Sequence, residues 1–90
     1  MAGYKGHRII YTTHALVRAR LRGVSEQEII DTVESPDVAY PSDNYPGREV
    51  LKRRFSEACE VSVVVVPPRG RRDPVGVISV WPNTEETKDR

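Results

Sequence analysis

Hydrophobic positions along the chain divide it into an N-terminal part with helical periodicity and a C-terminal part with strand-like patterns. Residues 8–11 contain a short apolar run, which predicts a first strand. Thr12 or Thr13 then supplies a side-chain oxygen that can cap a helix continuing to about Arg22. Gly23 ends this helix, because glycine tolerates the left-handed conformation that helix ends often adopt.

The start of a second helix is marked by a complete capping box. Ser25 is the cap, and Glu28 follows three residues later, so each side chain can bond the other's backbone N–H. Pro36 ends the segment, because the residue before a proline avoids helical angles. The sequence therefore predicts a helix over residues 26–34. Its apolar stripe comprises Ile29, Ile30 and Val33.

Beyond Pro36 the periodicity changes to that of strands. Residues 38–40 form a short extended piece, and residues 48–55 alternate between two faces. Residues 61–66 are β-branched and continuous except for one serine, which is typical of a central strand buried on both faces. Residues 75–81 form the last strand. These elements predict an α+β fold, with two N-terminal helices packed on one face of a three- or four-stranded antiparallel sheet.

Ninety residues suffice for one domain, which we expect over residues 1–82, followed by a polar, disordered tail over 83–90. No apolar run approaches the roughly 20 residues that span a bilayer, so we expect no membrane association and a cytoplasmic location. Cys59 is the single cysteine, which excludes a disulfide framework and favours a buried, inert thiol. No histidines have metal-ligand spacing, so we expect neither a metal nor another cofactor.

The net charge of +1 conceals a strong segregation of charge. Residues 1–24 hold five basic side chains and no acid, whereas residues 25–37 hold five acids and no base. A nearly neutral total argues against indiscriminate coating of nucleic acid, but it leaves room for one basic face. Two copies of the chain could also associate through the basic first helix and the acidic second helix.

The first predicted helix carries the chain's most suggestive side chains. His14 and Arg18 lie one turn apart on one face, and Arg22 lies one turn further. An imidazole can transfer protons near neutral pH, and a guanidinium can bind a phosphate and its developing charge. The alternative interpretation is that His14 forms local hydrogen bonds or packs as a flat core residue.

Further basic and aromatic side chains could contact RNA. Lys52 and Arg54 share one face of a predicted strand, where they could follow a phosphate backbone or merely protect an exposed edge. Arg72, with its neighbours in the loop over residues 69–72, could bind RNA or lie at an exposed hairpin tip. Trp81, like two tyrosines at positions 40 and 45, could stack on bases or form the rim of the core.

The motif over residues 14–25 resembles a known family. It reads His-Ala-x-x-Arg-x-x-x-Arg-Gly-Val-Ser and precedes Glu-Ile-Ile and Pro-Asp, a pattern found in a widespread prokaryotic family of small proteins of unknown function. That family is similar to the RelE- and BrnT-like toxins, which are metal-independent ribonucleases. The resemblance implies RNA cleavage through the 2′-hydroxyl, with His14 and Arg18 matching the family's histidine and arginine. Trp81 is the nearest match to the basic or aromatic C-terminal residue of many RelE-like enzymes.

Two hypotheses of function follow. The first is a metal-independent endoribonuclease of toxin–antitoxin type, in which His14 acts as general base or acid and Arg18 binds the phosphate. Arg22, Lys52, Arg54, Arg72 and Trp81 are then candidates for RNA binding. The second is a non-catalytic module that binds RNA or a protein, such as an acidic, antitoxin-like partner.

Overall fold

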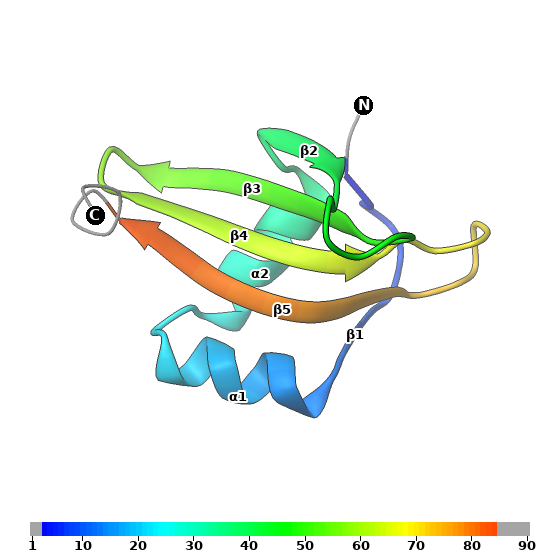
Figure 1. The fold of residues 1–90 in the computed structure, drawn as a ribbon, viewed down its shortest axis with the longest axis horizontal. Helices are drawn as coiled ribbons and strands as arrows, with labels where there is room; N and C mark the ends of the chain where they lie inside the picture. The colour runs from blue at the N-terminus through cyan, green and yellow to red at the C-terminus, as the bar shows by residue number, and fades with distance from the viewer. Residues whose placement is uncertain (1–2, 85–90) are drawn as a thin grey trace.

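The computed structural model describes residues 3–84, and the side chains through residue 82, as two helices and five strands (Figure 1). In chain order the elements are β1 (Ile9–Tyr11), α1 (Thr13–Leu21), α2 (Glu26–Glu34), β2 (Val38–Pro41), β3 (Glu49–Ser56), β4 (Cys59–Val66) and β5 (Val75–Thr84). The predicted order of elements is confirmed. The last strand extends three residues beyond its predicted end at Trp81, and residues 85–90 of the predicted tail lie outside the described part.

The sheet differs from the predicted one in size and in strand direction. It has five strands in the order β1-β5-β4-β3-β2, and β1 runs parallel to β5, with Ile9 opposite Val75. The other neighbours are antiparallel. The prediction of a three- or four-stranded antiparallel sheet is therefore wrong in these respects. A short apolar run identifies a strand, but its partner lies more than sixty residues away and is chosen by tertiary packing.

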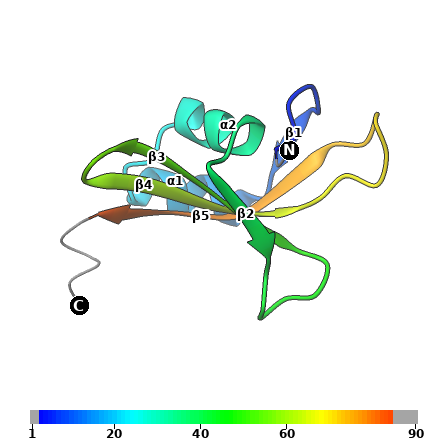
Figure 2. The same cartoon turned by 90° about the horizontal axis from the view of Figure 1, so that it is seen from above.

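The two helices enclose the core against the sheet (Figure 2). α2 packs on β3 and β4, and α1 packs along β5 at the side of the sheet (Figure 1). Leu51 and Arg53 lie on the same face of β3, because side chains alternate along a strand. Leu51 is buried in this core. Arg53 reaches the end of α2, where its Nη1 donates to the Ser35 carbonyl at 2.6 Å. The fully buried side chains of β4 and β5 in the core are Val61, Val63, Val65, Val75, Val77 and Val80.

α1 lies close to β5 because its inward side chains are small. Only Ala15 and Ala19 of this helix are buried. Thr12 caps the helix by accepting a hydrogen bond from the Ala15 backbone N–H at 3.0 Å, and its own N–H donates to the Val77 carbonyl. Gly23 follows the helix with a φ of +72°, as the sequence predicts.

In the part of the chain that the structure describes, no helix covers the opposite face of the sheet, which we call the open face (Figure 2). Paired positions across the strands place Tyr40, Val50, Val64 and Ser79 in one row. β5 holds one extra residue here, because Val64 pairs with Ser79 and Val65 pairs with Val77, which leaves Ile78 between them. Such a bulge changes the direction of the side chains beside it.

Candidate functional site

His14 and Arg18 are both accessible on α1. The Thr12 cap fixes the first turn of the helix, and both side chains are exposed one turn apart. The His14 ring forms no hydrogen bond with any described residue, so neither core packing nor a local hydrogen bond accounts for it. An imidazole and a guanidinium are thus open to a ligand on the same stretch of helix.

Arg22 has a structural contact that the sequence did not predict. Its Nη1 donates to the Val80 carbonyl of β5 at 2.8 Å. β1 pairs with residues 75–77 of β5, so the Val80 carbonyl lies beyond the part of this strand that β1 can reach. The Arg22 guanidinium supplies the donor for this carbonyl. Arg22 therefore fastens the end of α1 to the sheet, whereas Arg18 makes no such contact in the described chain.

Lys52 and Arg54 lie on the open face of β3. The Lys52 ammonium lies 5.6 Å from the centre of the Tyr40 ring, and Arg54 Nη1 donates to the Glu57 carbonyl at 2.8 Å. β4 separates β3 from β5, so these strands are about 10 Å apart at the usual strand spacing. Lys52 and Arg54 thus form a patch separate from His14 and Arg18. The sequence alone was compatible with all four side chains contacting the same RNA phosphate.

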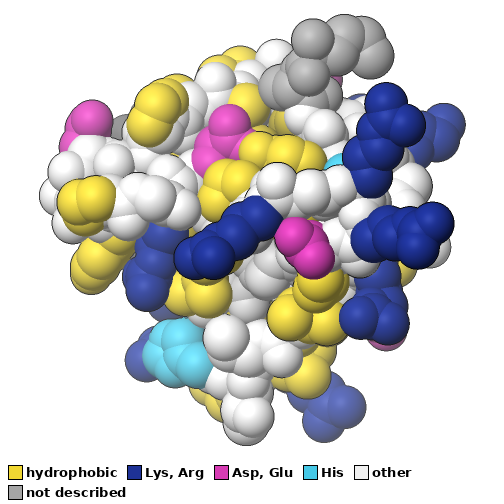
Figure 3. Space-filling view, turned by 90° about the vertical axis from the view of Figure 1, so that its right-hand side faces the viewer, with side chains coloured by type: hydrophobic (Ala, Val, Ile, Leu, Met, Phe, Trp, Pro, Cys, Tyr) yellow, Lys and Arg dark blue, Asp and Glu magenta, His cyan; other side chains and the backbone are white. Residues whose placement is uncertain are grey.

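Arg72 belongs to a basic end of the molecule. The loop between β4 and β5 lies against the segment that precedes β1, because His7 Nδ1 is 3.0 Å from the Asp73 carbonyl oxygen. Lys and Arg side chains gather at this end, which Figure 3 faces. The exposed basic residues of the two segments, which we call the basic end, are Lys5, Arg8, Arg69, Arg71 and Arg72.

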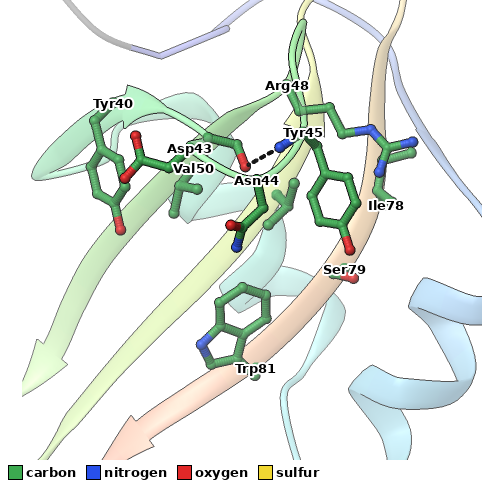
Figure 4. Close-up of a pocket in the computed structure, with 11 residues that line it drawn as sticks. Tyr40, Asp43, Asn44, Tyr45, Arg48, Val50, Ile78, Ser79 and Trp81 are labelled. Atoms are coloured by element: carbon green, nitrogen blue, oxygen red, sulfur yellow. Dashed lines mark hydrogen bonds between the residues drawn. The ribbon is translucent and has the colours of Figure 1, made fainter.

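Trp81 lines a hollow of about 360 Å³ on the open face (Figure 4). We call it the aromatic hollow, because Tyr40, Tyr45 and Trp81 reach it from β2, the β2–β3 loop and β5. Trp81 is half-buried, which agrees both with stacking on a base and with a place at the rim of the core. Lys52, over the Tyr40 ring, is adjacent to this hollow.

The loop over the aromatic hollow is held by its own hydrogen bonds. Ser42 Oγ accepts from the Tyr45 N–H at 3.3 Å, and the Ser42 N–H donates to the Arg48 carbonyl at 2.9 Å. The Arg48 guanidinium lies 5.0 Å from the centre of the Tyr45 ring. The sequence indicated the three aromatic residues as candidates for base stacking, but it did not indicate Arg48 or its polar neighbours as site residues. Only the folded loop brings these polar residues above the sheet. The missed polar lining residues are Ser42, Asp43, Asn44, Arg48 and Ser79.

A second hollow of about 270 Å³ adjoins the first. It lies beside β1 and includes Thr12, the cap of α1, two residues before His14. Ile78, at the bulge of β5, lines both hollows, and its carbonyl accepts from Thr12 Oγ1 at 3.4 Å. Ile78 therefore connects the aromatic hollow with a hollow that reaches the residue capping α1.

The comparisons with known proteins add no homologue. No family model, curated protein or solved structure matches the chain. Within residues 3–82, no three His, Cys, Asp or Glu side chains are grouped so that they could hold a metal ion. No helix in the described part is long and apolar enough to cross a membrane.

Proposed function

We propose that this protein is a metal-independent endoribonuclease of the RelE- and BrnT-like toxin type. The observation that carries the proposal is the exposed His14 ring, which has no hydrogen-bond partner among the described residues and lies one turn from the exposed Arg18. An imidazole without an internal partner is available for proton transfer, and a neighbouring guanidinium supplies the positive charge that a phosphate needs.

In the proposed reaction, the RNA strand supplies its own nucleophile. The 2′-oxygen gives up its proton and forms a bond to the adjacent phosphorus, while the bond from phosphorus to the 5′-oxygen breaks. The products are a 2′,3′-cyclic phosphate and a 5′-hydroxyl that has gained a proton. His14 acts as general base or acid in these transfers, and Arg18 stabilises the charge on the pentavalent phosphorane.

The test is cleavage of a short single-stranded RNA in the presence of a metal chelator. His14→Ala should lower the cleavage rate by about two orders of magnitude or more, the range expected for acid–base catalysis. His7→Ala is the matched control, because His7 is the other histidine and its ring faces the Asp73 carbonyl. Unchanged cleavage by a folded His14→Ala variant would remove His14 from the mechanism.

A second candidate is a non-catalytic module that binds RNA or an acidic protein, and the basic end supports it. Five exposed cations on two adjoining segments form a surface for a polyanion without requiring any chemistry. Binding that weakens steeply with salt and yields no cleavage products would favour RNA binding alone. Association with an acidic, antitoxin-like partner without affinity for RNA would favour the protein-binding role.

Self-association through helix charge is a third possibility. α1 carries Arg18 and Arg20 without an acid, whereas α2 carries Glu26, Asp31 and Glu34 without a base. Two copies docked through these helices should dissociate as salt screens the charges. Sedimentation at low and high salt tests this, and a monomer at every salt concentration contradicts it.

A further inference from the structure

The aromatic hollow has no role in the reaction proposed for His14 and Arg18. Val50 and Val64 of the sheet form its apolar floor. Each of these side chains is only 8% exposed. Tyr40, Tyr45 and Trp81 surround this floor from three separate elements (Figure 4). Tyr45 is 55% exposed and Tyr40 is 39% exposed, so the hollow presents neighbouring aromatic side chains to solvent.

The polar side chains around the hollow can bond a planar, polar ligand. Figure 4 shows the Asn44 amide pointing down from the loop towards the Trp81 indole. Asp43 and Ser79 also line the hollow, so amide, carboxylate and hydroxyl groups surround the aromatic surfaces. Aromatic faces with hydrogen-bonding groups at their rim suit an unpaired nucleobase, which stacks by its face and is bonded at its edge.

The surroundings of the hollow also suit the charge of a nucleic acid. The Arg48 guanidinium lies over the Tyr45 ring, and the Lys52 ammonium lies beside the Tyr40 ring. Each cation is therefore next to an aromatic surface on which a base could stack, as in sites that bind single strands. A volume of about 360 Å³ is near the lower end of small-ligand sites, which run from about 300 to 1,000 Å³.

We propose that the aromatic hollow binds an unpaired nucleobase of the RNA strand and positions that strand along the open face. The proposal rests on the proposed function for the identity of the polymer. The second hollow shares Ile78 with the aromatic hollow and reaches Thr12, the cap of α1, so a strand held at Trp81 could pass Ile78 towards the start of α1 and His14.

The test uses Trp81, the chain's only tryptophan, as an intrinsic fluorescent probe. The full chain is titrated with a single-stranded decamer of 2′-O-methyl RNA, which lacks the free hydroxyl that the proposed cleavage needs. Saturable quenching of Trp81 is expected. Tyr45→Ala should weaken binding about tenfold, within the range measured for loss of one stacked base, whereas Tyr45→Phe should retain it.

Two further measurements separate stacking from charge and binding from cleavage. A duplex of the same sequence and heparin serve as polyanions without unpaired bases, and equal quenching by either would overturn the proposal. Tyr45 lies in an exposed loop, so its variants are expected to fold, and circular dichroism checks this. Cleavage of unmodified RNA is followed in parallel.

The outcomes distinguish the two proposals. If the wild type cleaves RNA and a folded Tyr45→Ala variant binds and cleaves as well as the wild type does, the base-binding proposal fails and the ribonuclease proposal stands. If Trp81 is quenched through Tyr45 but no cleavage occurs, the hollow is supported and the ribonuclease proposal fails. If the decamer does not bind, the base-binding proposal fails whatever the cleavage assay gives.

Discussion

Arg18 of α1 and Arg22, the residue that follows this helix, have different surroundings. The Arg22 guanidinium donates to the Val80 carbonyl, whereas the Arg18 guanidinium is exposed and bonds to no described residue. From the sequence both were candidates to bind RNA, because spacing alone cannot tell a solvent-facing guanidinium from one that serves a backbone carbonyl. The same side-chain type therefore stabilises the fold at one position and is available to a ligand at the other.

Replacing these two arginines should separate stability from activity. Arg22→Ala should lower the free energy of unfolding by about 1 kcal/mol, because the Val80 carbonyl loses a charged donor. Arg18→Ala should leave stability unchanged and lower RNA cleavage. Urea unfolding and the cleavage assay measure the two effects, with Arg20→Ala as the control on the same helix. A stability loss in Arg18→Ala as large as that in Arg22→Ala would contradict this division.

Tyr4 links the N-terminal segment to the sheet. Its hydroxyl donates to Glu49 Oε1 of β3, and its backbone N–H donates to the Val33 carbonyl of α2 at 2.8 Å. Burial, followed by the hydrogen bond and the negative charge of Glu49, raises the pKa of Tyr4 from 10.0 to about 12. The folded protein therefore retains the Tyr4 proton at a pH where the unfolded chain releases it.

Stability should consequently decline as the pH rises from about 10 towards 12. Deprotonation favours the unfolded chain in this window, so the contribution from Tyr4 is complete below pH 10 and is lost as the pH approaches 12. Tyr4→Phe should show a shallower decline in the free energy of unfolding. The difference between wild type and variant is the quantity to measure, since burial also raises the pKa of Tyr11. Parallel curves would exclude Tyr4 as the source.

At the scale of elements, α2 is the segment that the local sequence specifies most completely. Ser25 Oγ accepts from the Glu28 N–H at 3.1 Å, and the Glu28 carboxylate accepts from the Ser25 N–H at 2.9 Å. The predicted capping box and both helix boundaries are confirmed. These interactions span only three residues, so they are readable from the sequence and do not depend on the rest of the fold.

Removing the cap should destabilise the protein by a predictable amount. Ser25→Ala leaves the Glu28 N–H without its side-chain acceptor and should cost about 1 kcal/mol in the free energy of unfolding. Ser56→Ala, at the exposed end of β3, is the matched control and should change stability little. Equal stability of the Ser25→Ala variant and the wild type in urea unfolding would contradict the role of this cap.

At the scale of the whole molecule, charge is distributed unevenly over the surface. The basic end combines two segments that are about sixty residues apart in sequence (Figure 3). The acidic residues of positions 26–34 belong instead to α2, and this helix lies behind β3 and β4 in the view of Figure 1. A net charge of +1 therefore conceals a surface that can still attract a polyanion at one end.

The salt dependence of RNA binding should report on this end. If the β4–β5 loop contacts phosphates, replacing Arg69, Arg71 and Arg72 with alanine should reduce the slope of log K against log salt by about 2. That value assumes three contacts to a single strand at about 0.7 each. Titrating the 2′-O-methyl decamer between 50 and 200 mM salt measures the slope. An unchanged slope would mean that the loop stays in solvent.

The sequence by itself determined the features that depend on neighbouring residues. The capped helices, the glycine at the end of α1, the alternation of β3 and the continuous valines of β4 all follow from short-range sterics, hydrogen bonding and periodicity. His14 and Arg18 could be placed on one helix face for the same reason. Their accessibility could not be predicted, because it depends on which face of α1 packs on β5.

Tertiary structure alone decided the features that join distant segments. The parallel pairing of β1 with β5, the bond from Arg22 to Val80 and the contact between His7 and Asp73 connect residues far apart in the chain. The aromatic hollow likewise needs β2, the following loop and β5 to meet over one row of the sheet. Contacts of this kind are selected by the packing of the whole core, which local patterns in the sequence do not specify.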